Sequence, residues 1–322
     1  MSESILKETL EAEKRIRQYT RETPLDPSPY LSQIGKSRVY LKLENIQHSG
    51  SFKVRGALSK YLSLSESEKE KGIITASSGN HGAAVAYVLN KFAGKGTICI
   101  PLSTPRSKVD LLRLYGADLE FYGECSIATE AYAQEKAKKN GLTYISPYND
   151  LKVIGGQGTI GIELLTQVER IDAVLVPIGG GGLISGIGGY LKSVAKNIEI
   201  IGCETENSPA MSASIKAGKI IDVPYMQTLA DGTVGGMEQG SITFELCKNI
   251  VDDYILVSEE EIAQAIRLII ERHYMILEGA AAMSVASFLK QKERFQGKNV
   301  VLLLTSSKIG IETLKEILFR RT

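Results

Sequence analysis

One lysine in the chain lies in a setting that suits covalent chemistry. Lys53 belongs to the segment QHSGSFKVRGA (residues 47–57), which follows an expected strand at 39–43 and opens a helix. A positive charge is unfavourable at a helix N-terminus, so this position favours the neutral form of an amine. A neutral amine is the form that attacks a carbonyl carbon, which makes Lys53 a candidate nucleophile. A solvated lysine on a first helical turn would show the same pattern.

A run of four glycines is the second feature that could do chemistry. Residues 174–189 read VLVPIGGGGLISGIGG, which predicts a buried strand, a glycine loop and a helix from Leu183 to Ala195. Glycine amides at a helix N-terminus can all point at a phosphate dianion, because no Cβ blocks its approach. No GxxxxGK[ST] occurs, so a nucleoside triphosphate is not the expected ligand. The run predicts a site for a phosphate-bearing organic cofactor, and a tight strand-to-helix turn is the alternative.

Two further segments place polar groups at the ends of expected strands. Thr75–Gly82, TASSGNHG, precedes a helix, and hydroxyls and amides at a helix N-terminus suit a carboxylate. An ordinary turn in which Ser78 or Asn80 only caps the helix is the alternative. The strand expected at 300–304 ends in the hydroxyls of residues 305–307, a pattern that indicates little by itself.

Motifs of other enzyme classes are incomplete. Residues 156–161, GQGTIG, match GxGxxG, but no strand runs into them and no acidic residue follows about 20 positions later. We interpret this segment as a helix start packed closely against a neighbouring element. The sequence has no GxSxG, and its three histidines lack metal-ligand spacing, which disfavours serine and metal-assisted hydrolysis. Its four cysteines stand far apart and are expected in the core of a protein from a reducing compartment.

Composition and patterning indicate a two-lobed α/β protein. Short β-branched runs alternate with helical segments, which predicts parallel sheets with helices on both faces. The expected strands are 39–43, 73–75, 97–101, 119–122, 143–146, 173–178, 198–203 and 300–304. The 322 residues include 38 basic and 37 acidic ones, so nucleic acid is not an expected partner.

The same patterning disfavours an association with membranes. The charged segment 1–18 predicts an amphipathic helix and no signal peptide. No apolar stretch approaches the roughly 18 residues of a membrane span. We therefore expect a cytoplasmic protein without a membrane partner.

Three segments together resemble a known family. LENIQHSGSFKVRGA, SSGNHG and PIGGGGLISG occur in the order and roughly the spacing found in pyridoxal-phosphate-dependent serine/threonine dehydratases and serine racemase. The resemblance extends over nearly the whole chain and implies fold type II, with two domains, each a twisted, mostly parallel sheet flanked by helices. It implies a large cofactor-binding domain from residues 1–72 and 149–322 and a small domain from residues 73–148.

The resemblance also implies roles for individual residues. Lys53 is similar to the lysine that binds pyridoxal 5′-phosphate covalently and takes the α-proton, and Ser78 is similar to the residue on the opposite face of the cofactor ring. The implied cofactor contacts are Phe52, Lys53, Asn80, Gly179, Gly180, Gly181, Gly182, Leu183 and Thr305. The implied contacts of the substrate carboxylate are Ser77, Ser78, Asn80 and His81.

Two positions depart from the pattern of that family. The family's SGGN is here Thr305-Ser306-Ser307-Lys308, which admits Ser306 as an alternative to Thr305 beside the pyridine nitrogen. The divalent-metal site of some members is matched only at Glu204, because Ala210 stands where an aspartate is expected, so we expect no metal.

The implied activity is α,β-elimination from L-threonine or L-serine, which yields a 2-oxo acid and ammonia. Racemisation of serine and dehydration of another β-hydroxy amino acid are alternatives, and β-replacement is a third. A binding protein without catalysis is also compatible with the glycine loop. We expect a small amino acid as substrate and a homodimer as the assembly.

Overall fold

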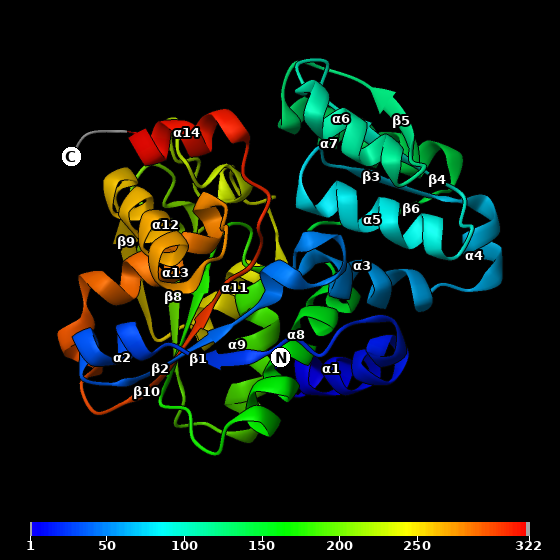
Figure 1. The fold of residues 1–322 in the computed structure, drawn as a ribbon. Helices are drawn as coiled ribbons and strands as arrows, with labels where there is room; N and C mark the ends of the chain where they lie inside the picture. Colours follow the sequence, from blue (N-terminus) through cyan, green and yellow to red (C-terminus); the bar gives the residue numbers. More distant parts are fainter. Residues whose placement is uncertain (1, 320–322) are drawn as a thin grey trace.

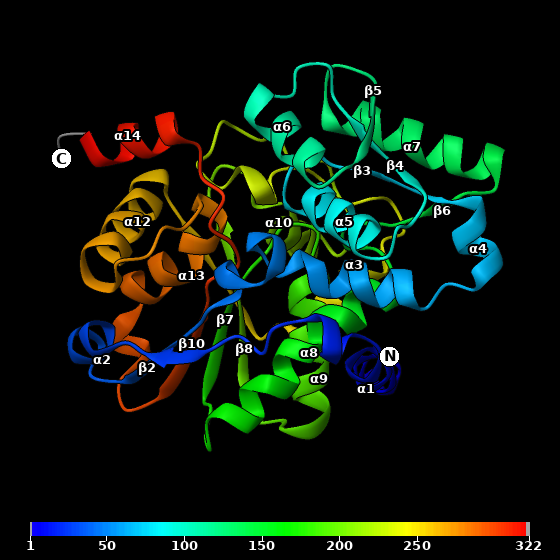
Figure 2. The same cartoon turned by 45° about the vertical axis from the view of Figure 1, so that its right-hand side comes forward.

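Two sheets organise the chain into two lobes (Figures 1 and 2). The computed structural model describes residues 2–319, and its strands form a six-stranded and a four-stranded sheet. The large sheet has the order β1-β2-β10-β7-β8-β9, and the small sheet has the order β5-β4-β3-β6. All neighbouring strands are parallel except β1 and β2. The expected α/β class with parallel sheets is therefore confirmed.

The strands follow the β-branched runs of the sequence. They are β1 (Leu25–Pro27), β2 (Arg38–Lys42), β3 (Ile73–Ala76), β4 (Gly96–Ile100), β5 (Asp118–Phe121), β6 (Thr143–Tyr144), β7 (Ala173–Pro177), β8 (Glu199–Thr205), β9 (Asp253–Val257) and β10 (Asn299–Leu303). Eight of these lie within about two residues of an expected strand. The edge strands β1 and β9 were not expected, and β6 is shorter than the expected segment 143–146.

Helices connect the strands and cover both faces of the sheets. They are α1 (Ser2–Ile16), α2 (Pro29–Gly35), α3 (Lys53–Leu62), α4 (Glu66–Lys71), α5 (Asn80–Lys91), α6 (Arg106–Leu114), α7 (Ser126–Asn140), α8 (Leu151–Gln167), α9 (Gly182–Val194), α10 (Ala210–Ala217), α11 (Ile242–Ile250), α12 (Glu259–His273), α13 (Gly279–Lys290) and α14 (Ile311–Phe319). Short 3₁₀ turns include η1 (Arg17–Tyr19), η2 (Glu44–Ile46), η3 (His48–Gly50), η4 (Asp231–Thr233) and η5 (Lys292–Phe295). None of the helices in residues 2–319 has the length and apolarity needed to span a membrane.

Alternating side chains of the large sheet build two separate cores. Leu175 and Leu302 face a layer that contains α12 and α13, whereas Val176 and Val301 face a layer that contains α8, α9 and α11. This alternation is the two-residue period of a strand, and burial on both faces explains why the runs are continuously apolar.

The small sheet is formed entirely by strands between Ile73 and Tyr144. Ile98 and Ile100 pack with α5 and α6, and Ile74 and Cys99 pack with α7 on the other face. The domain limits expected from the sequence, 1–72 with 149–322 and 73–148, stay a prediction.

The GxGxxG segment lies inside helix α8, not at a helix start. A methyl group at Gly156 would meet the carbonyl oxygen of Arg55 at 2.6 Å, and one at Gly161 would meet the ring of Tyr190 at 2.9 Å. These glycines allow α3 and α9 to pack closely on α8. The expectation of close packing is confirmed, and the expected position at a helix start is wrong.

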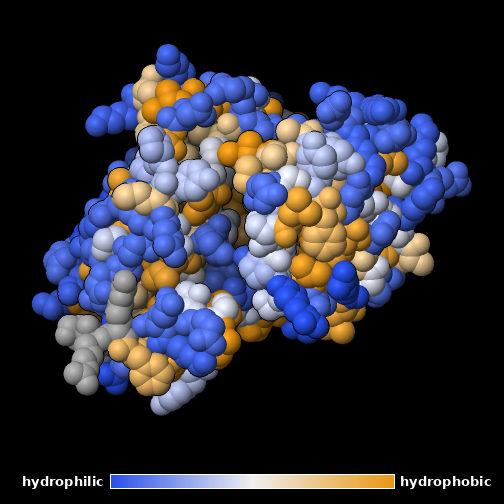
Figure 3. Space-filling model, turned by 90° about the horizontal axis from the view of Figure 1, so that it is seen from above, coloured by the Kyte–Doolittle hydropathy of each residue, from blue (hydrophilic) through white to orange (hydrophobic). Residues whose placement is uncertain are grey.

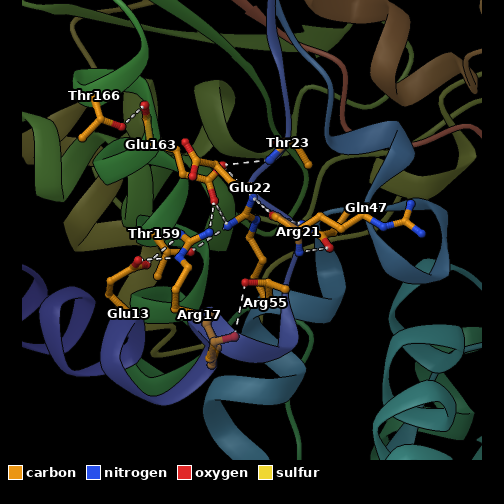
Figure 4. Close-up of polar contacts among 12 residues, drawn as sticks. Glu13, Arg17, Arg21, Glu22, Thr23, Gln47, Arg55, Thr159, Glu163 and Thr166 are labelled. Carbon is orange, nitrogen blue, oxygen red and sulfur yellow. Dashed lines mark hydrogen bonds and ion pairs between the residues drawn. The ribbon is translucent and has the colours of Figure 1, made fainter.

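A buried network of charges joins α3 to the elements beneath it (Figure 4). The guanidinium of Arg55 in α3 donates to Glu163 of α8 at 2.7 and 2.9 Å and to Glu44 of η2 at 2.8 and 2.9 Å. Lys42 of β2 donates to Glu163 at 2.5 Å, and Arg17 of η1 is 2.8 Å from the same carboxylate. Arg55, Lys42 and Glu44 have no exposed surface.

Electrostatics in the network favour the charged forms of its members. Burial would by itself raise the pKa of Glu163, but the nearby charges of Arg55 and Lys42 lower it to about 2. Four of the donors on Arg55 are matched to two carboxylates in a fork geometry that a lysine cannot reproduce. Because Arg55 is two residues from Lys53, the network holds the first turn of α3 in place.

We expect Glu163→Gln to lower the free energy of unfolding at pH 7 by about 3–5 kcal/mol, since it leaves Arg55 and Lys42 with one carboxylate fewer. Chemical denaturation measures this loss. Folding lowers the pKa of Glu163. The ionised carboxylate therefore stabilises the folded protein above about pH 4.5, the ordinary pKa of a glutamate, and this stabilisation is lost as the pH falls toward about 2. The exposed pair Glu312–Lys315 provides the control, because Glu312→Gln should change stability by less than about 1 kcal/mol. Equal effects of the two substitutions would contradict a structural role for the network.

Candidate active site

Lys53 is the first residue of α3 and lies between the two lobes. Its Nζ donates to the carbonyl oxygen of Pro147 at 2.8 Å and is 5.2 Å from the centroid of the Phe52 ring. Burial lowers the pKa of the Lys53 amine from 10.5 to about 8, although the carboxylates of Glu278 and Glu130 partly oppose this. A larger fraction of neutral amine is therefore available near neutral pH than an exposed lysine would supply.

The glycine loop ends at the N-terminus of α9. Gly181 has φ of +81°, which favours glycine, and it is the N-cap residue of the helix. A methyl group at Gly180 would meet the ring of Tyr148 at 2.5 Å, and one at Gly179 would meet Thr233 at 3.0 Å. The first turn of α9 directs its free N–H groups toward this loop, so the loop can bind an anion. The side chain of Leu183 packs in the core, which leaves its N–H for this purpose.

The second anion-binding turn is at the start of α5. Gly79 donates its N–H to the hydroxyl of Ser77 at 3.2 Å, and a methyl group at Gly82 would collide with the carbonyl oxygen of Ser77. The side chains of Ser77, Ser78 and Asn80 are all half-buried. Hydroxyls and first-turn amides are thus gathered at a helix N-terminus, as a carboxylate ligand requires.

The imidazole of His81 makes its hydrogen bonds within the small lobe. Its Nε2 is 3.0 Å from the hydroxyl of Thr75 and 3.0 Å from the carbonyl oxygen of Ile145. Burial, followed by the positive charge of Lys53, lowers the pKa of His81 to about 3, so the ring is neutral. The expectation that His81 contacts a substrate carboxylate stays a prediction, and its backbone N–H is the group available for it.

Asn80 is held by a buried carboxylate that the sequence did not indicate. Its Nδ2 donates to both oxygens of Glu278, at 2.9 and 3.0 Å, and its Oδ1 is buried without a donor. Burial raises the pKa of Glu278, while Ser306 and Asn80 lower it. This contact fixes the amide plane of Asn80 and leaves one acceptor for a ligand.

The segment that follows β10 lies against the lysine loop. Thr305 is buried and accepts the N–H of Phe52 at 3.1 Å, and Ser306 forms an isolated bridge with Ser51. Lys308 has a buried amine without a hydrogen-bond partner, and burial lowers its pKa to about 8. Thr305 and Ser306 are both close to the lysine loop, so either remains available for the role expected of Thr305.

Glu204 is used to cap a helix. It accepts the N–H groups of Met211 and Ser212, both at 2.9 Å, at the start of α10. Residues 2–319 contain no group of three or more metal-ligating side chains. Two backbone donors thus satisfy this buried carboxylate, and the expectation of no metal stays a prediction.

The contacts bring most of the expected site residues together. Lys53 reaches Pro147, and the neighbouring Tyr148 covers the glycine loop. On the other side Glu278 accepts from Asn80 and donates its own N–H to the carbonyl oxygen of Ser306 at 3.3 Å. Seen from above, the surface is hollowed between the two lobes (Figure 3).

These residues fit pyridoxal phosphate. The half-buried amine of Lys53 suits its aldehyde, the loop whose Gly180 cannot carry a methyl group suits its phosphate, and the unpartnered Oδ1 of Asn80 suits a ring substituent.

Sequence reasoning missed the residues that support this site. Glu278, Tyr148 and Pro147 contact expected site residues but come from segments without a motif. The only local signal for Glu278 is its position before the small residues 279–282 at the start of α13.

Comparisons with known proteins agree with this geometry. The family model described as pyridoxal-phosphate dependent enzyme matches residues 16–306. A catabolic L-threonine dehydratase of Staphylococcus aureus is 41% identical over 312 residues, which cover 96% of this chain and 90% of that protein.

Solved structures show the same relationship. The processed form of threonine deaminase isoform 2 from Solanum lycopersicum has a TM-score of 0.93 and 32% identity, over 98% of this chain and 87% of that one. Serine racemase from Dictyostelium discoideum has a TM-score of 0.88 and 35% identity, over 95% of this chain and 99% of that one. The chain therefore belongs to the fold-type-II family of pyridoxal-phosphate-dependent enzymes that includes the serine/threonine dehydratases and serine racemase.

Proposed function

We propose that the protein converts L-threonine, L-serine or both to a 2-oxo acid and ammonia by α,β-elimination. The observation that carries the proposal is the amine of Lys53, whose pKa burial lowers to about 8, between two helix N-termini that can each bind an anion. The names of similar proteins support it, since the relative from Staphylococcus aureus is an L-threonine dehydratase and that from Solanum lycopersicum is a threonine deaminase.

Bound pyridoxal phosphate supplies an electron sink for the bonds of the substrate α-carbon. We propose that the start of α5 binds the substrate carboxylate through Ser77, Ser78 and the first-turn amides. Lys53 would hold the cofactor through its amine and, with that amine free, would take the substrate α-proton as general base. The β-hydroxyl leaves with a proton as water, and hydrolysis of the resulting enamine gives the 2-oxo acid and ammonia.

Lys53 needs its surroundings for both roles. The carbonyl oxygen of Pro147 accepts from Nζ at 2.8 Å and so orients the amine toward the space between the lobes. Burial that lowers the pKa of Lys53 also makes it a base matched to a pH near 8. We propose that Glu278 positions Asn80 beside the cofactor ring, because it fixes the amide by two hydrogen bonds.

Racemisation is the second candidate, and Ser78 is the observation that favours it. Ser78 lies half-buried in the turn before α5, where it could carry a proton on the face opposite Lys53. A serine racemase is also among the similar structures. We propose racemisation as a side activity, because elimination needs only the base at Lys53.

The assembly, the domain division and the location remain part of the proposal. We propose a cytoplasmic homodimer whose large cofactor-binding domain contains residues 1–72 and 149–322 and whose small domain contains residues 73–148. The small sheet, with strands only from within residues 73–144, supports that division.

Release of 2-oxo acid and ammonia should be measured with the L- and D-forms of threonine, serine and 3-hydroxyaspartate. We expect the highest kcat/KM for L-threonine or L-serine and equimolar ammonia and 2-oxo acid. Lys53→Ala should lower kcat by at least about 10²–10⁴-fold because it removes the general base. A protein that binds the cofactor but releases no 2-oxo acid from any of the six compounds would contradict the proposed function.

Ser78→Ala should separate elimination from racemisation. If Lys53 alone takes the α-proton, the variant keeps 2-oxo acid formation from the L-substrate and loses exchange between enantiomers. If Ser78 takes part in elimination, that rate should fall by about 10²–10⁴-fold as well. Chiral chromatography and the 2-oxo acid assay on one sample measure both. Loss of L-elimination with D-elimination retained would show that the two faces are assigned the wrong way round.

A further inference from the structure

Two carboxyl groups meet where the lobes face each other. Glu130 lies on α7 and Glu238 lies in the loop between η4 and α11, and their side chains are within hydrogen-bond reach of each other. Tyr144 donates its hydroxyl to Oε1 of Glu130 at 3.1 Å, and Asn149 donates Nδ2 to Oε2 of Glu238 at 2.9 Å. Each carboxyl therefore has one oxygen satisfied by a neutral donor.

The second oxygen of Glu238 has no donor unless Glu130 carries a proton. Oε1 of Glu238 is buried and has no hydrogen-bond partner among the described residues. Ionised carboxylates only accept hydrogen bonds, so two of them cannot satisfy each other. One proton shared between the two groups removes both the repulsion and the missing hydrogen bond.

The charges around the pair agree with this arrangement. Burial, then repulsion from Glu238, raises the pKa of Glu130 to about 7, while Tyr144 and Lys53 lower it. The groups that form hydrogen bonds with the pair are neutral: Asn149, Tyr144 and the phenol of Tyr148, whose oxygen accepts the N–H of Glu238 at 2.9 Å. Two lysines lie near the pair. The amine of Lys53, which donates to Pro147, lowers the pKa of Glu130, whereas Lys138 of α7 lines the same pocket as Glu238 but is exposed, so water screens its charge.

The pair connects elements that belong to different sheets. Helix α7 packs on the small sheet through Ala133 and Ala137, whereas α11 packs on the large sheet beside α9. In the loop before α11, the backbone N–H of Glu238 also donates to the hydroxyl of Tyr148. The ring of Tyr148 lies against Gly180. A change in the contact between Glu130 and Glu238 therefore affects Tyr148, whose ring covers the glycine loop.

We propose that Glu130 and Glu238 are a positioning pair that shares one proton and thereby holds α7 against the loop 234–241, which favours closure of the site between the lobes. The proposal rests on the proposed function only for its effect on turnover. The pair is distinct from the groups that contact substrate or cofactor.

The sign of the pH dependence follows from the shared proton. When the lobes separate, Glu130 returns to its ordinary pKa of 4.5, whereas in the closed arrangement its pKa is about 7. The closed arrangement therefore binds the proton more tightly and is favoured at low pH. Closure should weaken as the pH rises from about 4.5 to about 7 and become independent of the pH above about 8. Between pH 6 and pH 8 the equilibrium constant for closure should fall about tenfold.

Hydrogen–deuterium exchange of the holoenzyme without substrate tests this directly. In Glu130→Gln the amide keeps an acceptor for Tyr144 and supplies a permanent donor to Glu238. At pH 8 the peptides that contain α7 and residues 234–241 should exchange more slowly in E130Q than in the natural protein, by up to about 300-fold, the factor that corresponds to pKa values of 4.5 and about 7. At pH 6 this slowing should be about tenfold smaller, because the natural pair then takes up a proton when the lobes close. Comparison at equal pH removes the intrinsic pH dependence of exchange.

Two further variants make the test specific. Glu238→Gln should reproduce E130Q, because either amide supplies the missing donor. Glu135→Gln removes the same charge from an exposed position on α7 and should leave exchange unchanged. With L-threonine, E130Q should lower KM at pH 8 more than it changes kcat.

Equal exchange of E130Q and the natural protein at pH 8, or the same slowing in E135Q, would overturn the proposal. An enzyme that released no 2-oxo acid would leave the exchange result untouched, so failure of the proposed function is distinguishable from failure of the pair.

Discussion

The buried pairing of Arg55 with Glu163 and Glu44 is the constraint on which the site depends. Arg55 has no exposed surface and uses its guanidinium to join α3, α8 and η2. Removal of such charges from water costs several kcal/mol each, so the hydrogen bonds must keep one geometry. That geometry fixes the first turn of α3, which begins with Lys53. Gly56 completes the arrangement, since any side chain there would collide with Gln157 of α8.

The chemistry of the site depends on burial as much as on the motifs. The same desolvation lowers the pKa of Lys53 and raises the pKa of Glu278 and Glu130. Each shift favours the neutral form of the group, in which an amine can attack a carbonyl carbon and a carboxyl group can donate a hydrogen bond. Parallel sheets gather these groups, because their strands end at one edge and the following helices begin there with free N–H groups.

Local sequence patterns predicted the parts of the site that depend on the backbone. The glycine loop, the turn before α5 and the strand before residue 305 have conformations set by neighbouring residues, so their motifs could be recognised. Strand β9 was missed because it begins at the acidic residue Asp253 and has only a short apolar run after it, and β1 is only three residues long. Glu278, Tyr148 and Glu238 act through contacts about 90 to 200 residues away in sequence, which periodicity cannot reveal. His81 could be located but not the direction of its ring, because that depends on Ile145.

The central claim is that this framework presents one particular amine to the cofactor. Borohydride reduction of the holoenzyme, followed by peptide mapping, tests it most directly. The account predicts that the reduced pyridoxyl group is found on Lys53 alone, although Lys308 has a buried amine whose pKa is also lowered to about 8. A label on Lys308 or Lys42, with Lys53 unmodified, would contradict the account.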